Sequence, residues 1–338
     1  EYYEKFVAER GDDPNLQAGL AAAHLRVGGI LSMLGNHTRA VEEYGQGIHV
    51  LERLVAGETD VDKYRADLGT AYRRLGRDLS YVGRTDDSQD AFQKSISIGE
   101  KLAAENPKSL ERQSELASAY GDFCTACLRT GHHDQTVPLA KKVIDISKAL
   151  TVADPDNSDY LGSLAGAYNI LGWSLEQNGN WDEVVNAYRK SCEILEELAA
   201  AESEILGRRH ALAGSSHNLA LALYEMGKWD EAEGFFRKAI QISEVLAAEN
   251  PSVVKYRVFL ANHWSDLSIV EKKMNKCDEA LASLQKSIDI REEIARQQAG
   301  VATYQWMLAT DYNNQGLMLW EMQSHDMASV SFQKARDI

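Results

Sequence analysis

Apolar residues recur along this chain at steps of three and four, the spacing of a helix with one buried face. Between residues 160 and 177 the apolar positions are Leu161, Leu164, Ala165, Tyr168, Leu171, Gly172 and Leu175. Residues 182–200 repeat the pattern at Val185, Tyr188, Cys192, Leu195 and Leu198. No window alternates convincingly with period two. The pattern therefore predicts paired amphipathic helices and no strands.

This helix pair recurs without insertion along the chain. The residue between the two helices of each pair is Gly35, Gly83, Gly131, Gly179, Gly227, Asn275 or Gln323. A core position follows each of them at a constant distance, at Tyr44, Phe92, Ala140, Tyr188, Phe236, Leu284 and Phe332. The period of about 48 residues falls in the range that indicates a stacked repeat architecture. We therefore predict a single array of about seven helix pairs over residues 14–338, preceded over residues 1–13 by the end of an earlier helix.

The helix ends carry their own signals. Glycine suits the left-handed conformation that follows the first helix of a pair. We expect carboxylates to cap the second helix at Asp182, Asp230, Asp278 and Asp326. Proline blocks continuation between repeats at Pro107, Pro155 and Pro251. Pro138 instead falls near the first turn of a second helix, where a missing N–H is tolerated.

The stretch YNILGWSL, from Tyr168 to Leu175, resembles the tetratricopeptide repeat. The Leu-Gly pair of that family's pattern recurs as Leu75-Gly76, and its Ala-x3-Phe pair stands as Ala232 and Phe236. The period here is longer than the family's usual period of about 34 residues. The resemblance implies an all-α fold, a right-handed superhelical solenoid of antiparallel helix pairs. It says little about the ligand.

A narrower resemblance concerns the opening segment. Residues 1–30, followed by long repeats, are similar to the region after the kinase domain in bacterial serine/threonine protein kinases with tetratricopeptide tails. The chain itself contains no phosphate-binding loop and no set of kinase motifs. We therefore expect a piece of a longer protein, in which any kinase domain lies outside these residues.

The net charge of −15 over 338 residues argues against a general nucleic-acid binder, which needs a basic stripe. No apolar run reaches the length of about 18 residues that membrane insertion requires. The four cysteines provide no disulfide framework, which points to a reducing compartment such as the cytoplasm. With nucleic acid and membrane insertion disfavoured, we expect the partner to be a protein or a peptide.

One stretch, CTACLRTGHHD, suggests metal chemistry. Cys124 and Cys127 with His132 and His133 could bind zinc. However, both cysteines fall at core positions of their helix, and no second cysteine pair exists. We therefore interpret them as small buried side chains and expect no metal, cofactor or catalytic residue.

In the tetratricopeptide family the first helices line a concave groove. If the same holds here, the residues that face the groove lie 13, 10, 9, 6 and 3 positions before each turn residue. Asparagine amides could pair with the backbone of an extended peptide, and tryptophans could anchor apolar residues. A solvated polar face is the alternative interpretation. YNNQG, from Tyr312 to Gly316, resembles the asparagine-bearing first helices of kinesin light chain. The candidates are Arg73, Arg77, Asn169, Trp173, His217, Asn218, Asn262, Asp266, Asn313 and Trp320.

These features predict a non-catalytic scaffold that binds a peptide or partner protein in its groove. The resemblance to kinase tails implies the regulatory or recruitment tail of a bacterial signalling kinase. Two alternatives remain open from the sequence. One is a metal-dependent or enzymatic role at the Cys124, Cys127, His132 and His133 cluster. The other is a purely structural spacer.

Overall fold

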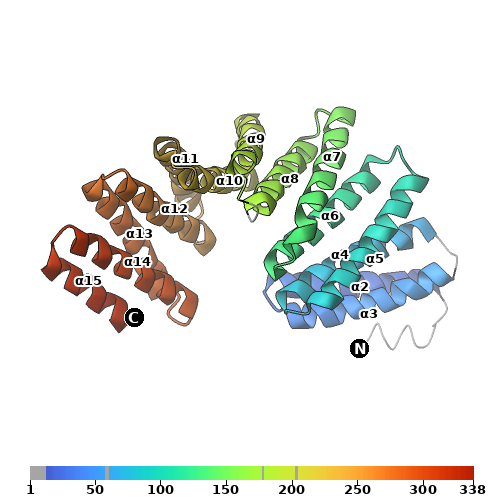
Figure 1. Ribbon diagram of the computed structural model, residues 1–338. Coiled ribbons are helices and arrows are strands. Elements are labelled where there is room, and N and C mark those ends of the chain that lie inside the picture. Colours follow the sequence, from blue (N-terminus) through green and yellow to red (C-terminus); the bar gives the residue numbers. More distant parts are fainter. Residues whose placement is uncertain (1–12, 58–60, 177–178, 202–204) are drawn as a thin grey trace. The chain divides into compact units, whose positions relative to one another are not determined.

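A computed structural model of the protein describes residues 13–57, 61–176, 179–201 and 205–338 (Figure 1). The described residues form α-helices joined by short turns, with one 3-10 helix and no strand. The all-α prediction is confirmed. The chain divides into two compact units, Glu1–Asn178 and Gly179–Ile338. Each unit is described separately below, and the handedness of a superhelix spanning both stays a prediction.

In the first unit, helices that follow one another in the sequence pack against one another. The first helices of neighbouring pairs also touch, α2 with α4, α4 with α6, and α6 with α8. The elements are α2 (Pro14–Met33), α3 (His37–Ala56), α4 (Val61–Tyr81), α5 (Thr85–Glu105), α6 (Leu110–Thr130), η1 (His133–Gln135), α7 (Thr136–Ala153) and α8 (Ser158–Glu176).

The second unit is built in the same way, with each helix packed on the next. Its helices are α9 (Trp181–Ala201), α10 (Leu206–Glu225), α11 (Trp229–Glu249), α12 (Val254–Lys273), α13 (Cys277–Gln297), α14 (Ala302–Glu321) and α15 (His325–Asp337). The segments 160–177 and 182–200 predicted from periodicity correspond to α8 and α9, within two residues at each end.

The turn between the helices of a pair has the same backbone conformation in every repeat. All five turn glycines have positive φ, from 67° at Gly179 to 81° at Gly131. Asn275 at 58° and Gln323 at 62° adopt it too, although they carry side chains. The left-handed ending predicted from the sequence is therefore confirmed, including in the two repeats that lack glycine.

The predicted carboxylate caps are wrong at all four helices. The helices α9, α11, α13 and α15 begin one residue before Asp182, Asp230, Asp278 and Asp326, so each aspartate lies within the first turn. The N-cap residues of the last three helices are Lys228, Lys276 and Ser324, and none makes a side-chain cap hydrogen bond. The aspartates can still interact with the positive end of the helix dipole.

In three helix pairs, close approach depends on a glycine seven residues before the turn. A Cβ atom added to Gly28 would lie 2.9 Å from the ring of Tyr44, and one added to Gly76 would lie 2.9 Å from Phe92. Gly316 shows the same relation to Phe332, at 2.6 Å. Tyr44 and Phe92 are fully buried, as their periodic position predicts. Glycine and aromatic ring together set the spacing of the pair.

The predicted end of an earlier helix, residues 1–13, lies almost entirely outside the described residues. The first described helix, α2, begins at Pro14, and the side chain of Asp13 accepts a hydrogen bond from the amide of Asn15 at 2.9 Å. This aspartate therefore caps α2.

Candidate functional site

The first helices present a common face, formed by positions −13, −10, −9, −6 and −3 relative to each turn residue; we call it the first-helix face. In the first unit, Arg73 on α4 pairs with Asp122 on α6 at 2.6 Å. In the second unit, His217 on α10 lies 3.5 Å from Asp266 on α12, and Lys272 binds Glu321. Polar contacts therefore join first helices of successive repeats, as ion pairs at Arg73–Asp122 and Lys272–Glu321 and as a contact of a neutral histidine with a carboxylate at His217–Asp266.

Among the candidates of the first unit, Arg73 is half-buried and already ion-paired. Arg77 is more accessible, with a guanidinium nitrogen 3.9 Å from a carboxylate oxygen of Asp78. Asn169 is half-buried on α8. One turn later, Trp173 is 39% exposed, a large apolar surface open to solvent.

The candidates of the second unit differ in how free their side chains are. Asn218 is half-buried and Asn313 is exposed. Trp320 is 57% exposed, and its ring lies 4.4 Å from that of His325. Asn262, by contrast, accepts a hydrogen bond from Arg291 at 3.0 Å, which engages its amide oxygen inside the unit. Whether Asn169, Asn218, Asn262 and Asn313 line one channel stays a prediction, because they belong to two units.

Burial dominates the chemistry of His217 and Asp266. It lowers the pKa of His217 to about 4 and raises the pKa of Asp266 to about 6. Arg291 opposes the rise at Asp266 and Asp311 adds to it. Near pH 7 His217 is therefore neutral, whereas Asp266 remains mostly ionised and adds negative charge to the face.

A buried polar cluster in the second unit escaped the sequence analysis. Asp311, fully buried, accepts hydrogen bonds from Ser265 at 2.9 Å and Ser287 at 2.5 Å. Arg291 lies 2.9 Å from the same carboxylate. Asp311 occupies the register position of Ala71. A charged residue at a position that the first four repeats fill with alanine was the signal available in the sequence.

The cysteine-histidine stretch shows packing rather than a binding site. Cys124 and Cys127 are buried, and desolvation raises their pKa values to about 11 and about 12. His132 lies at the turn, with its Nδ1 atom 3.1 Å from the hydroxyl of Thr130. Within the described part of the chain, no group of three or more histidine, cysteine or acidic residues is placed to hold a metal ion.

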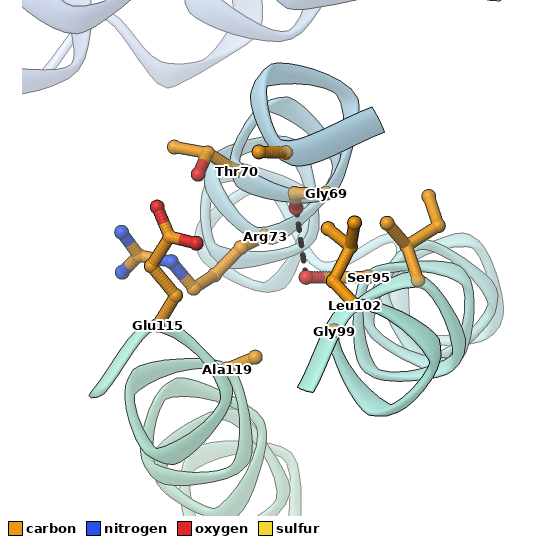
Figure 2. A pocket seen from close by; sticks show the side chains of 10 residues that line it. Gly69, Thr70, Arg73, Ser95, Gly99, Leu102, Glu115 and Ala119 are labelled. Carbon is orange, nitrogen blue, oxygen red and sulfur yellow. Dashed lines mark hydrogen bonds between the residues drawn. The ribbon is translucent and has the colours of Figure 1, made fainter. Parts of the chain in front are cut away.

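Cavities recur between repeats at one register position. The first lies between α4, α5 and α6 and has a volume of about 20 Å³, room for no more than a single water molecule. Figure 2 shows its labelled lining residues, including Arg73 and Glu115, and the hydrogen bond of 2.8 Å from Ser95 to the carbonyl oxygen of Gly69. The next cavity, between α6, α7 and α8, measures about 220 Å³.

None of the helices in the described segments is both long and apolar enough to cross a lipid bilayer.

Comparison with known proteins agrees with this architecture. Residues 212–251 match the family model described as tetratricopeptide repeat. A search of curated protein sequences found no significant match. Several solved structures share the fold at low sequence identity.

BtubC (BKLC) from P. vanneervenii is 16% identical, with 73% of this chain and 88% of that chain covered at a TM-score of 0.56. The apo form of RapI is 13% identical, with coverages of 94% and 99% at a TM-score of 0.53. The S. pombe nuclear import adaptor Nro1 is 14% identical, with coverages of 86% and 96% at a TM-score of 0.53. The chain therefore has a tetratricopeptide-like repeat fold, an architecture generally found in protein-interaction scaffolds.

Proposed function

We propose that this protein is a non-catalytic scaffold that binds an extended segment of a partner protein along the first-helix face. One observation carries the proposal. Position −6 relative to the turn holds a large apolar side chain in four successive repeats, and each is solvent-exposed. These residues are Trp173 at 39%, Leu221 at 39%, Ile269 at 38% and Leu317 at 47%.

A row of this kind suits an extended peptide. Leu221, Ile269 and Leu317 lie on α10, α12 and α14 of one unit, one side chain for each repeat. An extended chain presents alternate side chains to one side, so successive apolar residues of a ligand can each meet one member of the row. The exposed amide of Asn313 offers a donor and an acceptor for the ligand backbone. Burial of exposed apolar surface provides the driving force.

The test is a selection of binders from a library of extended peptides, followed by titration against three variants. The triple variant Leu221→Ser, Ile269→Ser, Leu317→Ser removes the row in the second unit. Trp173→Ala probes the first unit, with an expected loss of about 2 kcal/mol if it is a central anchor. The control is Val245→Ser on the second helix α11, a comparably exposed apolar residue.

We expect the triple variant to lose at least about tenfold in affinity, equivalent to about 1.4 kcal/mol, and the control to bind normally. Equal loss in the control would assign binding to the second helices instead and reject the proposal. In the biological setting, we propose that the array is the recruitment tail of a bacterial signalling kinase. The resemblance of the opening segment supports this role, and sequencing the gene upstream of Glu1 tests it.

A further inference from the structure

The first-helix face of the first unit carries arginine without matching acid. Its positions on α2 and α4 include Arg26, Arg73, Arg74 and Arg77, and no aspartate or glutamate occurs among them. Arg129, near the end of α6, brings a further guanidinium group to α4. We call Arg26, Arg74, Arg77 and Arg129 the arginine patch. In a chain with a net charge of −15, this patch reverses the overall sign locally.

Other arginines of the same unit are neutralised by carboxylates. Arg65, at the start of α4, binds Glu105 at 2.7 Å. By contrast, no carboxylate oxygen of the described residues lies within 4.0 Å of the guanidinium groups of Arg26, Arg74 and Arg129. These three positive charges are therefore left for a ligand to balance.

Arg77 has one acidic neighbour, Asp78, whose nearer carboxylate oxygen lies 3.9 Å away. That distance is too long for a hydrogen bond, so the contact occupies none of the N–H donors of Arg77. Asp78 is fully buried, and its other oxygen lies 2.5 Å from Nδ1 of His37. The Arg77 side chain is 38% exposed. It can therefore donate to a ligand on the face.

Arg74 and Arg77 converge on one place. They lie three residues apart on α4, so their side chains leave the helix on the same side. Burial and the charge of Asp78 raise the pKa of Tyr44, and both arginines oppose this rise, so both guanidinium groups lie near the phenol hydroxyl. A Cβ atom added to Gly29 on α2 would lie 3.8 Å from that hydroxyl and 4.0 Å from Nη1 of Arg74. The hydroxyl is buried, so it marks the place without being open to a ligand.

Arg129 is held at the edge of this place by two contacts. Its guanidinium carbon lies 3.9 Å from the centre of the Tyr81 ring, and its Nη1 atom donates to the hydroxyl of Ser80 at 2.5 Å. Tyr81 in turn stacks on His37, with ring centres 4.3 Å apart. Ser80 follows Arg77 by three residues, so Arg129 reaches α4 one turn beyond it. Stacking leaves the other N–H donors of Arg129 available, because they lie in the plane of the guanidinium group.

Two converging guanidinium groups suit an anion that carries more than one charge. Arginine has a planar donor fork that binds phosphate oxygens bidentately. A phosphorylated side chain carries a charge of about −1.5 to −2 at pH 7 and three acceptor oxygens. A single carboxylate needs only one arginine, as Glu105 and Arg65 show. The net charge of −15 disfavours a nucleic acid, which is a long polyanion.

We propose that Arg74 and Arg77 bind the phosphoryl group of a phosphorylated side chain in the partner segment, with Arg129 contacting its edge. The inference rests on the proposed function, for which it specifies a charged anchor in the first unit. Without the phosphoryl group the arginine charges stay unbalanced. Phosphorylation of the partner therefore controls how tightly it binds.

The first experiment uses N-acetyl-O-phosphoserine amide, with N-acetyl-glutamic acid amide as the carboxylate probe. NMR titration of the full chain follows the arginine Nε–H signals, which Arg→Gln variants assign. We expect saturable shifts at Arg74 and Arg77, and at least about tenfold weaker binding of the carboxylate probe. Shifts confined to other arginines, or equal affinities for the two probes, would overturn the proposal.

Inorganic phosphate separates a phosphorylated side chain from a free anion. We expect it to compete with the phosphoserine probe for Arg74 and Arg77 and to bind more weakly, because it lacks the amide groups that contact the face. Tighter binding of inorganic phosphate would assign the site to a free anion and reject a partner side chain.

The double variant Arg74→Gln, Arg77→Gln removes the converging donors. We expect at least about tenfold weaker binding of the phosphoserine probe. The matched control is Arg39→Gln, Arg53→Gln, which removes the same charge from exposed positions on α3 of the same unit. It should bind the probe normally. An equal loss in the control would show that only the overall charge matters and would reject the site.

Gly29→Glu tests the site without removing an arginine. An added Cβ at this position meets no described atom closer than 3.8 Å, so the side chain fits, and its carboxylate can reach Arg74 from α2. We expect at least about tenfold weaker probe binding. Gly45→Glu on α3 adds the same charge at an open position and should have no effect. Normal probe binding by Gly29→Glu would contradict the placement of the site.

A peptide selection distinguishes failure of this inference from failure of the proposed function. Two libraries of extended peptides are compared, identical except for a fixed phosphoserine or serine. We expect the phosphorylated library to yield binders at least about tenfold tighter, with the difference lost in Arg74→Gln, Arg77→Gln. Binders that depend on Leu221, Ile269 and Leu317 but gain nothing from phosphate refute the anchor and leave the scaffold intact. Probe binding at Arg74 and Arg77 without any peptide binder would instead refute the scaffold.

Discussion

His217 and His263 meet through their Nδ1 atoms, which lie 2.9 Å apart on the neighbouring first helices α10 and α12. One nitrogen must donate and the other accept, so the accepting imidazole must be neutral and the two rings cannot both be protonated. Burial lowers the pKa of His217 to about 4. Burial, followed by repulsion from His217 and His210, lowers the pKa of His263 to about 3. The second unit thus holds two histidines whose protonation opposes folding.

The pH dependence of stability follows from the sign of these shifts. A histidine with a lowered pKa in the folded state contributes stability above its unfolded pKa of about 6.5, and this stability falls as pH drops toward the folded value. We expect the free energy of unfolding, taken relative to that of His263→Phe, to fall by about 1.4 kcal/mol per pH unit below 6.5, which is the contribution of His263 alone. Urea unfolding at pH 4.5 to 7.5 measures it.

The comparison with His263→Phe removes a competing effect. The raised pKa of Asp266, about 6, gives the opposite dependence. The folded state takes up this proton at a higher pH than the unfolded state does, so the free energy of unfolding rises as pH falls below about 6. Asp266 is present in both proteins, so its contribution largely cancels. A constant difference in unfolding free energy from pH 7.5 to 4.5 would show that His263 is charged or solvated in the folded protein.

Close helix approach gives a second prediction. Gly76→Ala places a methyl group 2.9 Å from the ring of Phe92, and we expect a loss of about 1–3 kcal/mol from overpacking. Gly45→Ala is the matched control, since an added Cβ there meets nothing within 4 Å. It should gain up to about 1 kcal/mol from helix propensity. Chemical denaturation measures the free energy of unfolding of both variants. An increase for Gly76→Ala would contradict the close approach of α4 and α5 at this glycine.

The turn at Gln323 gives a third prediction. A non-glycine residue in the left-handed region costs about 1–2 kcal/mol, and Gln323 has φ of 62°. We expect Gln323→Gly to stabilise the second unit by about 1 kcal/mol. Gly227→Ala, at φ of 74°, should have the reverse effect. Thermal unfolding of the two variants must shift in opposite directions for this interpretation of the turns to stand.

Thiol reactivity provides a fourth prediction. Cys277 is exposed at the start of α13, whereas Cys124, Cys127 and Cys192 are buried. Desolvation raises the pKa of each buried thiol, to about 11 for Cys124 and Cys192 and about 12 for Cys127. At pH 7.5 a maleimide should therefore label one thiol rapidly in the native protein and all four in denaturant. Rapid labelling of two or more native thiols contradicts the packing of the cysteines.

The repeat register could be derived from the sequence because turn and core chemistry recur at fixed spacing. Asn275 and Gln323 were placed at turns by register alone, and their positive φ angles agree. The helix starts were harder to place. Asp230 resembles a cap because aspartate is a good one, yet α11 begins one residue earlier at Trp229. A cap depends on local backbone angles that composition does not determine.

The candidate site was less accessible to such reasoning. The bond between Asn262 and Arg291 joins residues on different helices, and no periodic pattern reveals which buried polar groups will meet. The cavity between α6, α7 and α8 depends on the sizes of residues from three helices. The sequence does show that Gly121 occupies the register position of Arg73 one repeat earlier. Only the structure shows that this position borders the cavity between repeats, so that a change from arginine to glycine enlarges it.

The recurrence of that space at one register position has an evolutionary consequence. The residues that hold a repeat together, such as Gly76 and Phe92, are distinct from those that set the cavity's size, such as Arg73 and Glu115. Mutation can therefore open or close one compartment without loosening its neighbours. The binding properties of such a chain can therefore change one repeat at a time, while the helix packing that supports each repeat stays constant.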